Sequence, residues 1–182
     1  MKVMTQNSNI SERSFTYELS ILFSVVLMMA ALSRISIPLQ PVPVTGQTLG
    51  VMLTGVMLGR KRALAAMIIY IGMGVTGFPV FAAGTFGAAT LIGPTGGYLL
   101  GFIPAAFIMG YLGDKGWYNR TATAIPALLI GHAVIFACGL LWLMVLTKGS
   151  NVFALGFLPF IPGAIAKSLI ALALIPVVRK SF

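Results

Sequence analysis

The sequence is poor in charged residues, and above all in acidic ones. Of its 182 residues, 8% are charged and only three are aspartate or glutamate, whereas 58% are hydrophobic. An ordinary soluble domain has about 25% charged and about 45–50% apolar residues. One soluble core cannot bury so large an apolar fraction. The composition therefore excludes an ordinary soluble domain and predicts an integral membrane protein.

The sequence motifs of common enzymes and nucleotide-binding proteins are also missing. There is no G-x-x-x-x-G-K-[ST] phosphate loop and no H-E-x-x-H, G-x-S-x-G or C-x-x-C motif. The single cysteine, Cys138, can form no intrachain disulfide. We therefore expect no enzymatic activity, no metal and no cofactor. Any active transport would draw its energy from a partner or from an ion gradient.

Long apolar runs predict an all-α protein of six transmembrane helices. The runs are apolar all round rather than alternating, which excludes a transmembrane barrel. A span needs roughly 20 residues, so the chain has room for six spans with short loops. We predict a cytoplasmic segment over residues 1–14 and a single transmembrane domain over 15–182. Its predicted spans are Phe15–Ser33, Val44–Gly59, Ala63–Phe81, Ala89–Leu112, Ala122–Leu146 and Phe153–Val178.

Basic residues predict the orientation in the membrane, because cytoplasmic loops carry an excess of lysine and arginine. With the N-terminus in the cytoplasm, only Arg34 and Lys148 fall in outer loops. A cleaved signal peptide ending at Ala31-Leu32-Ser33 is the alternative interpretation of the first span, but the polar stretch before it is long for one. We expect a multi-pass protein of the cytoplasmic (inner) membrane with both termini inside. The remaining loop and terminal basic residues then lie inside: Lys2, Arg13, Arg60, Lys61, Arg62, Lys115, Arg120, Arg179 and Lys180.

The net charge of +9 does not indicate a nucleic-acid partner. The basic residues form short clusters between apolar runs, and no basic stripe is interleaved with aromatic residues. We therefore expect the lipid bilayer, and no nucleic acid, among the partners.

Two predicted outer loops are unusual. The segment 33–46 carries Pro38, Pro41 and Pro43, and the segment 78–95 is apolar but interrupted by Pro79 and Pro94. Broken backbone is tolerated at membrane depth where it packs on protein or lines a cavity. These segments either cover a ligand pocket on the outer side or are simply compact connections.

Lys167 lies inside the last predicted span, and the outer half of the protein has no carboxylate to pair with it. A lysine within a span costs roughly 2.5–3.5 kcal/mol on insertion scales, which suggests a function. Pro162 and Gly163 indicate that the regular helix begins near Gly163, where the helix dipole also favours an anion. We expect Lys167 to bind a ligand carboxylate. The alternative is that its side chain extends to the outer headgroups.

Other polar residues are weaker candidates for ligand contact. Thr45, Gln47 and Thr48 lie at the start of the second span, and Tyr98 opens the regular part of the fourth. Hydrogen bonds between helices are the ordinary role of such groups. His132 is interpreted as a packed residue rather than a metal ligand, because no second histidine or acidic residue lies near it in sequence.

Three segments together resemble the BioY family, the biotin-specific substrate-binding subunits of energy-coupling-factor importers. They contain PVPVTGQTLG, GPTGGYLLG and LPFIPGAIAK and lie within residues 35–59, 77–102 and 158–167. Lys167 matches the lysine of the family motif P-G-D-x-x-K, but Ala164 stands at the aspartate that is expected near the ureido ring of biotin. The resemblance implies six helices, a pocket beneath the outer loops, a transmembrane coupling subunit and cytoplasmic ATPase subunits.

From the residues and the resemblance we expect the substrate-binding subunit of a vitamin importer that binds biotin with high affinity. The alternatives are a facilitator that needs no ATPase, or a subunit for another small carboxylate ligand, since Ala164 removes the acidic group. If biotin is the ligand, the missing acidic group implies either weaker binding or replacement of that contact by another group such as Gln47 or Asn151. A membrane-embedded enzyme acting on lipid is disfavoured by the missing motifs. The predicted substrate-binding residues are Lys167, Tyr98, Gln47, Thr45, Gly163, Ala164, Phe81 and Asn151.

Overall fold

The computed structural model describes residues 2–149 and 151–180, with side chains for 15–149 and 151–177. Lys2, Arg13, Arg179 and Lys180, which contribute to the predicted orientation, therefore lie outside the described side chains. The prediction of an all-α protein is confirmed. The helices are α1 (Lys2–Arg34), α2 (Gln47–Val75), α3 (Ala88–Ile92), α4 (Gly96–Asp114), α5 (Thr121–Thr147), α6 (Val152–Gly156) and α7 (Ile161–Lys180). Short 3₁₀ turns lie at η1 (Ala82–Gly84), η2 (Trp117–Asn119) and η3 (Leu158–Phe160), and a small hairpin at β1 (Ser36–Ile37) and β2 (Val44–Thr45).

Four helical segments in the described part of the chain are long and apolar enough to cross a membrane. They are Phe15–Arg34, Gly96–Asp114, Thr121–Thr147 and Val152–Val177, and they correspond to the first, fourth, fifth and sixth predicted spans. The fourth predicted span, which is α4, begins at Gly96 and not at the predicted Ala89, because the chain turns at Gly93 and Pro94 after the short α3. The last predicted span is divided, and its regular part α7 begins at Ile161, two residues before the predicted start near Gly163.

The predicted second and third spans differ most from the structure, since together they form α2 and the predicted loop at Arg60–Arg62 is helical. The helix is kinked at Gly59, whose φ of 69° lies in the left-handed region that favours glycine. A Cβ atom there would also approach Asp114 Oδ1 to 2.5 Å. The second part of α2 ends at Val75, before the predicted Phe81.

Small residues allow α2 and α4 to pack closely at the kink. A Cβ atom on Gly110 would lie 2.6 Å from the backbone nitrogen of Arg60, and one on Gly55 would lie 2.6 Å from Met109 Cβ. Such close approach is how small residues stabilise helix pairs in membranes. Two ion pairs hold the same region, between Arg62 and Glu18 and, at 3.6 Å, between Arg60 and Asp114. The basic cluster is therefore an exposed helical turn beside this close helix contact.

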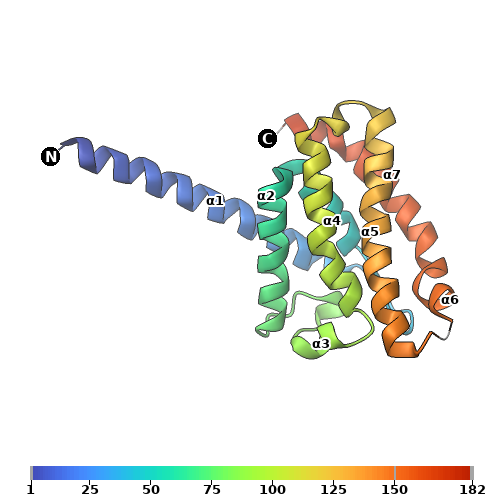
Figure 1. Cartoon of the computed structure of the whole chain (residues 1–182). Helices are drawn as coiled ribbons and strands as arrows, with labels where there is room; N and C mark the ends of the chain where they lie inside the picture. Colours follow the sequence, from blue (N-terminus) through green and yellow to red (C-terminus); the bar gives the residue numbers. More distant parts are fainter. Residues whose placement is uncertain (1, 150, 181–182) are drawn as a thin grey trace.

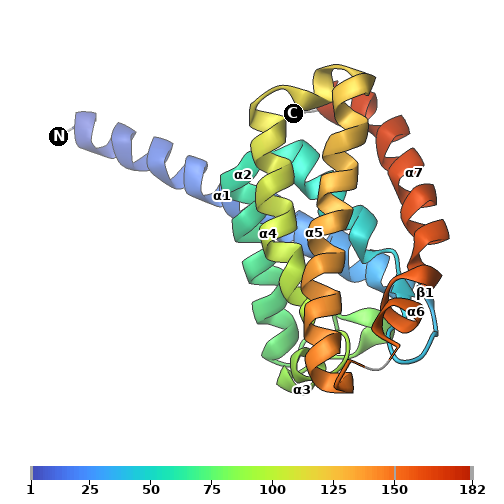
Figure 2. The ribbon, with the colours of Figure 1, turned by 45° about the vertical axis from the view of Figure 1, so that its right-hand side comes forward.

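The helices α2, α4 and α5 stand side by side, and α7 packs on α2 and α5 (Figure 1). The α4–α5 connection and the C-terminal end of α7 lie at one end of this bundle, and α3 and α6 lie at the other (Figure 2). Helix α1 runs across the direction of α2, α4 and α5, and its N-terminal part projects away from the bundle (Figure 1).

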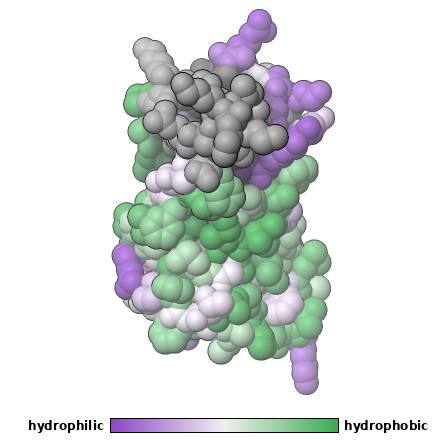
Figure 3. Space-filling view, turned by 90° about the vertical axis from the view of Figure 1, so that its left-hand side faces the viewer, coloured by the Kyte–Doolittle hydropathy of each residue, from purple (hydrophilic) through white to green (hydrophobic). Residues whose placement is uncertain are grey.

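The surface of the bundle is apolar over its middle. Large hydrophobic side chains are exposed on several helices, for example Leu129, Val145 and Leu169, whose exposed fractions are 58%, 77% and 62%. Figure 3 shows hydrophobic atoms across the middle of one face and hydrophilic atoms gathered mainly at the end of the α4–α5 connection. Exposed apolar surface on this scale indicates a lipid environment. The finding agrees with the prediction of a membrane protein.

Candidate functional site

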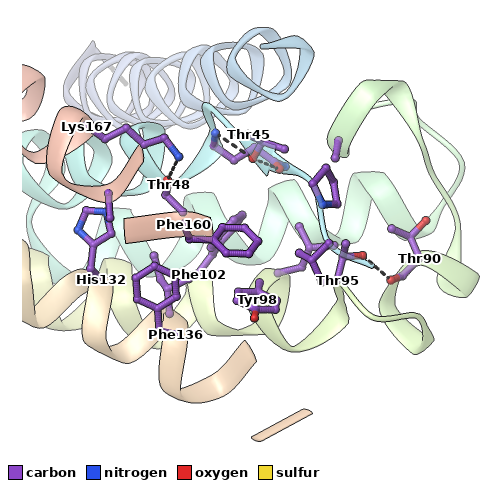
Figure 4. A pocket seen from close by; sticks show the side chains of 17 residues that line it. Thr45, Thr48, Thr90, Thr95, Tyr98, Phe102, His132, Phe136, Phe160 and Lys167 are labelled. Carbon is purple, nitrogen blue, oxygen red and sulfur yellow. Dashed lines mark hydrogen bonds between the residues drawn. The ribbon is translucent and has the colours of Figure 1, made fainter. Parts of the chain in front are cut away.

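A cavity lies inside the bundle towards the end that carries α3 and α6. The two proline-containing segments both contribute to it: Val42, Pro43 and Thr45 come from the first, and Ala82, Thr90 and Thr95 from the second. The remaining lining residues come from α2, α4, α5, η3 and α7 (Figure 4). They are Gln47, Thr48, Tyr98, Leu99, Phe102, His132, Ile135, Phe136, Phe160, Ala164 and Lys167.

Lys167 lies at one end of this cavity. Its ammonium donates a hydrogen bond of 2.8 Å to Thr48 Oγ1, so α7 and the start of α2 are joined across the site. An ammonium has three donors, and two remain for other acceptors. The described carboxylates, Glu18 and Asp114, pair with arginines. Among the described side chains Lys167 therefore has no carboxylate partner.

Aromatic rings form the middle of the cavity. The rings of Tyr98 and Phe160 are stacked with centroids 5.8 Å apart, and Phe136 meets Phe160 edge-on at 6.2 Å. The hydroxyl of Tyr98 donates to the carbonyl of Gly156 at 2.7 Å, so its ring is the part left for contact with a ligand. Gly139 makes room for that ring, because a Cβ atom there would lie 2.3 Å from Tyr98 Cδ1. The middle of the cavity can thus hold an apolar ring or chain.

A buried hydrogen-bond network supports another part of the wall. Thr45 donates to Gln47 Oε1 at 2.8 Å, and Gln47 Nε2 donates to the hydroxyl of Tyr70. Tyr70 in turn donates to the carbonyl of Val80 at 2.6 Å. Gln47 and Tyr70 are 3% and 0% exposed. The network therefore connects two lining residues to the loop after α2.

Comparison with known proteins places the chain in a family. The family model described as the BioY family matches residues 4–182. The chain belongs to the BioY family. The biotin transporter BioY2 of Lactococcus lactis subsp. cremoris is 38% identical over 159 residues, which are 85% of each chain. The biotin transporter BioY of Thermotoga maritima is 38% identical over 145 residues, 77% of this chain and 81% of that one.

A solved structure is similar over nearly the whole fold. It is the 2.1 Å crystal structure of the S-component for biotin from an ECF-type ABC transporter. The TM-score is 0.82 and the sequence identity 25%, and the match covers 92% of this chain and 93% of that chain. The helical bundle of this BioY-family chain thus has the fold of a biotin S-component.

Five of the eight residues predicted for the site line the cavity: Lys167, Tyr98, Gln47, Thr45 and Ala164. Gly163, Phe81 and Asn151 do not. Phe81 is fully buried against Tyr70 and fills the space above Gly74, where a Cβ atom would lie 2.0 Å from its ring. Asn151 is exposed at the start of α6.

Several lining residues were not predicted from the sequence, and Phe136 and His132 are the most informative. They lie four residues apart on α5 with ring centroids 6.0 Å apart, so that one face of this helix borders the cavity. The sequence spacing shows that the two share a face. Because α5 is apolar all round, however, the sequence does not reveal which face turns inward.

Proposed function

We propose that this protein is the substrate-binding subunit of a biotin importer. The observation that carries the proposal is the cavity, in which an ammonium without a carboxylate partner lies at one end and aromatic rings line the middle. Biotin carries a carboxylate and a polar ureido ring joined by apolar parts, which matches this pattern. Membership of the BioY family and the likeness to a biotin S-component support the same ligand.

The proposed contacts follow the lining of the cavity. Lys167 supplies a charged donor to the carboxylate, and the ring of Tyr98 packs on the apolar part of the ligand. Thr45 and Gln47 supply polar groups, and Ala164 supplies a methyl surface one helical turn before Lys167. A charge-assisted hydrogen bond from Lys167 is the strongest single contact in this set.

Three predicted site residues take supporting places in the proposal. Gly163 allows close packing, since a Cβ atom there would lie 3.3 Å from Val44 Cγ1 and 4.0 Å from Lys167 Nζ. Phe81 holds the loop that Tyr70 hydrogen-bonds. Asn151 is exposed at the start of α6 and lies outside the cavity lining, so the proposal gives it no direct contact with the ligand.

The proposed topology has six spans, with the two parts of α2 on either side of Gly59 counted as two. Both termini are then cytoplasmic, and the segments 33–46 and 78–95 close the cavity on the outer side. The end carrying Gly59 and the α4–α5 connection faces the cytoplasm. Arg60, Lys61, Arg62, Lys115 and Arg120 at that end support this orientation.

The proposed partners are a transmembrane coupling subunit and cytoplasmic ATPase subunits in the inner membrane, because the chain itself has no phosphate loop. The alternative is a facilitator that needs no ATPase. Replacement of the phosphate-loop lysine in the ATPase separates the two. The importer requires that uptake of biotin falls while binding to the purified subunit persists, and full uptake without an active ATPase would support the facilitator.

The ligand is tested by titration calorimetry on the purified protein. We expect tight binding of biotin and no comparable binding of thiamine, riboflavin or pantothenate. Pantothenate is the informative control, because it carries a carboxylate but no ureido ring. If pantothenate binds and biotin does not, the alternative of another small carboxylate ligand replaces this proposal.

A further inference from the structure

His132 carries an unused hydrogen-bonding atom at the site. It is 5% exposed and lines the cavity on α5, at the same end as Lys167 and one turn before Phe136 (Figure 4). Among the side chains that the structure describes, Nε2 of His132 is the buried nitrogen or oxygen without a hydrogen-bond partner. Leaving such a group unpaired destabilises the folded protein. A buried polar atom of this kind points to a missing partner.

The other ring nitrogen shows which kind of partner is missing. Nδ1 of His132 lies 3.3 Å from the carbonyl oxygen of Leu128 and 3.4 Å from Ser168 Oγ. A carbonyl oxygen can only accept, so this contact assigns the proton of the neutral imidazole to Nδ1. Nε2 then has a free lone pair and is an acceptor. Its partner must be a donor.

No side chain in the described part of the chain donates to Nε2. On the facing helix α7, Ala164 contributes only a methyl group to the same cavity. Lys167, a strong donor in the same lining, bonds Thr48 and not His132. Behind His132, between α5 and α7, lies an apolar groove lined by residues such as Leu129, Ile165 and Leu169. Lipid chains in that groove would also leave Nε2 unpaired.

We propose that His132 is a ligand-contacting residue whose Nε2 accepts a hydrogen bond from one ureido N–H group of biotin. The inference rests on the proposed function, because the ureido ring supplies the donor. Biotin has no N–H group outside the ureido ring, and its carboxylate, when ionised, can only accept hydrogen bonds. The ring of the ligand then lies beside Phe136 on α5, and its flexible carboxylate chain turns back to the two free donors of Lys167 on α7.

Three substitutions at one position test the role of Nε2 by calorimetry with biotin. His132→Gln places an amide near the position of Nε2, whereas His132→Asn reaches only as far as Nδ1, and His132→Phe keeps an aromatic ring without nitrogen. We expect His132→Asn and His132→Phe to weaken biotin binding about tenfold or more, and His132→Gln clearly less. Thermal unfolding of each variant shows whether it is folded.

A second arm changes the ligand instead of the protein. Two lactam analogues of biotin each replace one ureido N–H with a methylene group of similar size. One of them should bind the wild type about tenfold more weakly than biotin, and His132→Phe should reduce that difference to less than about threefold, as a double-mutant cycle requires. The inference about His132 is wrong if the wild type and folded His132→Phe bind biotin with equal affinity. It is also wrong if His132→Phe discriminates between biotin and the analogues as strongly as the wild type does. Both results leave the proposed function standing. Wild-type protein that binds no biotin overturns the proposed function as well.

Discussion

At the residue scale, Lys167 is the side chain that the sequence identifies best. A lone cation in an apolar span is conspicuous in sequence, and the structure places it in the lining of a cavity without a carboxylate partner among the described side chains. Its one hydrogen bond, to Thr48, leaves donors for a ligand. For His132 the sequence favours a packed residue, because a single histidine in an apolar helix gives no indication of its surroundings.

Replacing Lys167 tests its role in binding. Lys167→Met keeps the aliphatic stem and removes the ammonium, so the ligand loses a charge-assisted hydrogen bond of about 1.5–3 kcal/mol. We expect biotin affinity to fall about ten- to a hundredfold in calorimetry. Lys148→Asn is the matched control, because Lys148 is exposed in the α5–α6 connection with a φ of 51°, which asparagine tolerates. It should leave the affinity unchanged.

The carboxylate contact has its own control in the amide of biotin. If Lys167 binds the carboxylate, the amide binds the wild type weakly, and Lys167→Met discriminates little between amide and acid. A folded Lys167→Met protein with wild-type affinity would mean that the lysine reaches the headgroup region and takes no part in the site.

At the scale of elements, the sequence predicts apolar helices well and their ends poorly. The cluster Arg60–Arg62 suggests a loop, yet it lies within α2, where Asp114 and Glu18 pair with two of its guanidinium groups. Those partners are 54 and 44 residues away in sequence, so no local sequence pattern predicts the ion pairs. The helix is kinked one residue earlier, at Gly59, because glycine adopts a left-handed φ at little cost in free energy.

Hydrogen bonds between elements also hold the side chain of Gln47 in the cavity wall. Tyr70, on the second part of α2, receives the hydrogen bond of Gln47 and donates to Val80. Tyr70→Phe would leave two buried groups without a partner, at a cost of about 1–3 kcal/mol. We expect lower thermal stability together with several-fold weaker biotin binding, because Gln47 would no longer be held.

A second buried tyrosine provides the comparison. Tyr118 is 4% exposed and donates to the carbonyl of Met109 at 3.1 Å, and it does not line the cavity. Tyr118→Phe removes a single hydrogen bond and should lower thermal stability with no change in affinity. Equal affinities in the two variants would show that the Tyr70 network supports the fold but not the site.

At the scale of the whole molecule, the alternation of basic and apolar segments predicts an arrangement with two distinct ends. In the described part of the chain, Gly59 and the α4–α5 connection lie at one end, and the cavity lies towards the other, where α3 and α6 are found. The aromatic wall of the cavity could not be predicted in the same way. It is assembled from α4, α5 and η3, which are distant in sequence and show no polar face to define an inside.

The orientation of these ends is tested with single cysteines in a Cys138→Ser background. Lys61 and Lys115 are exposed at the end assigned to the cytoplasm, and Leu39 and Lys148 are exposed at the end of the cavity. Because cytoplasmic loops carry the excess of basic residues, cysteines at 61 and 115 should resist an impermeant thiol reagent applied to intact cells. Cysteines at 39 and 148 should react, and all four should react once the membrane is permeabilised. The reverse pattern in intact cells would place the cavity on the cytoplasmic side, where it could not capture biotin from outside.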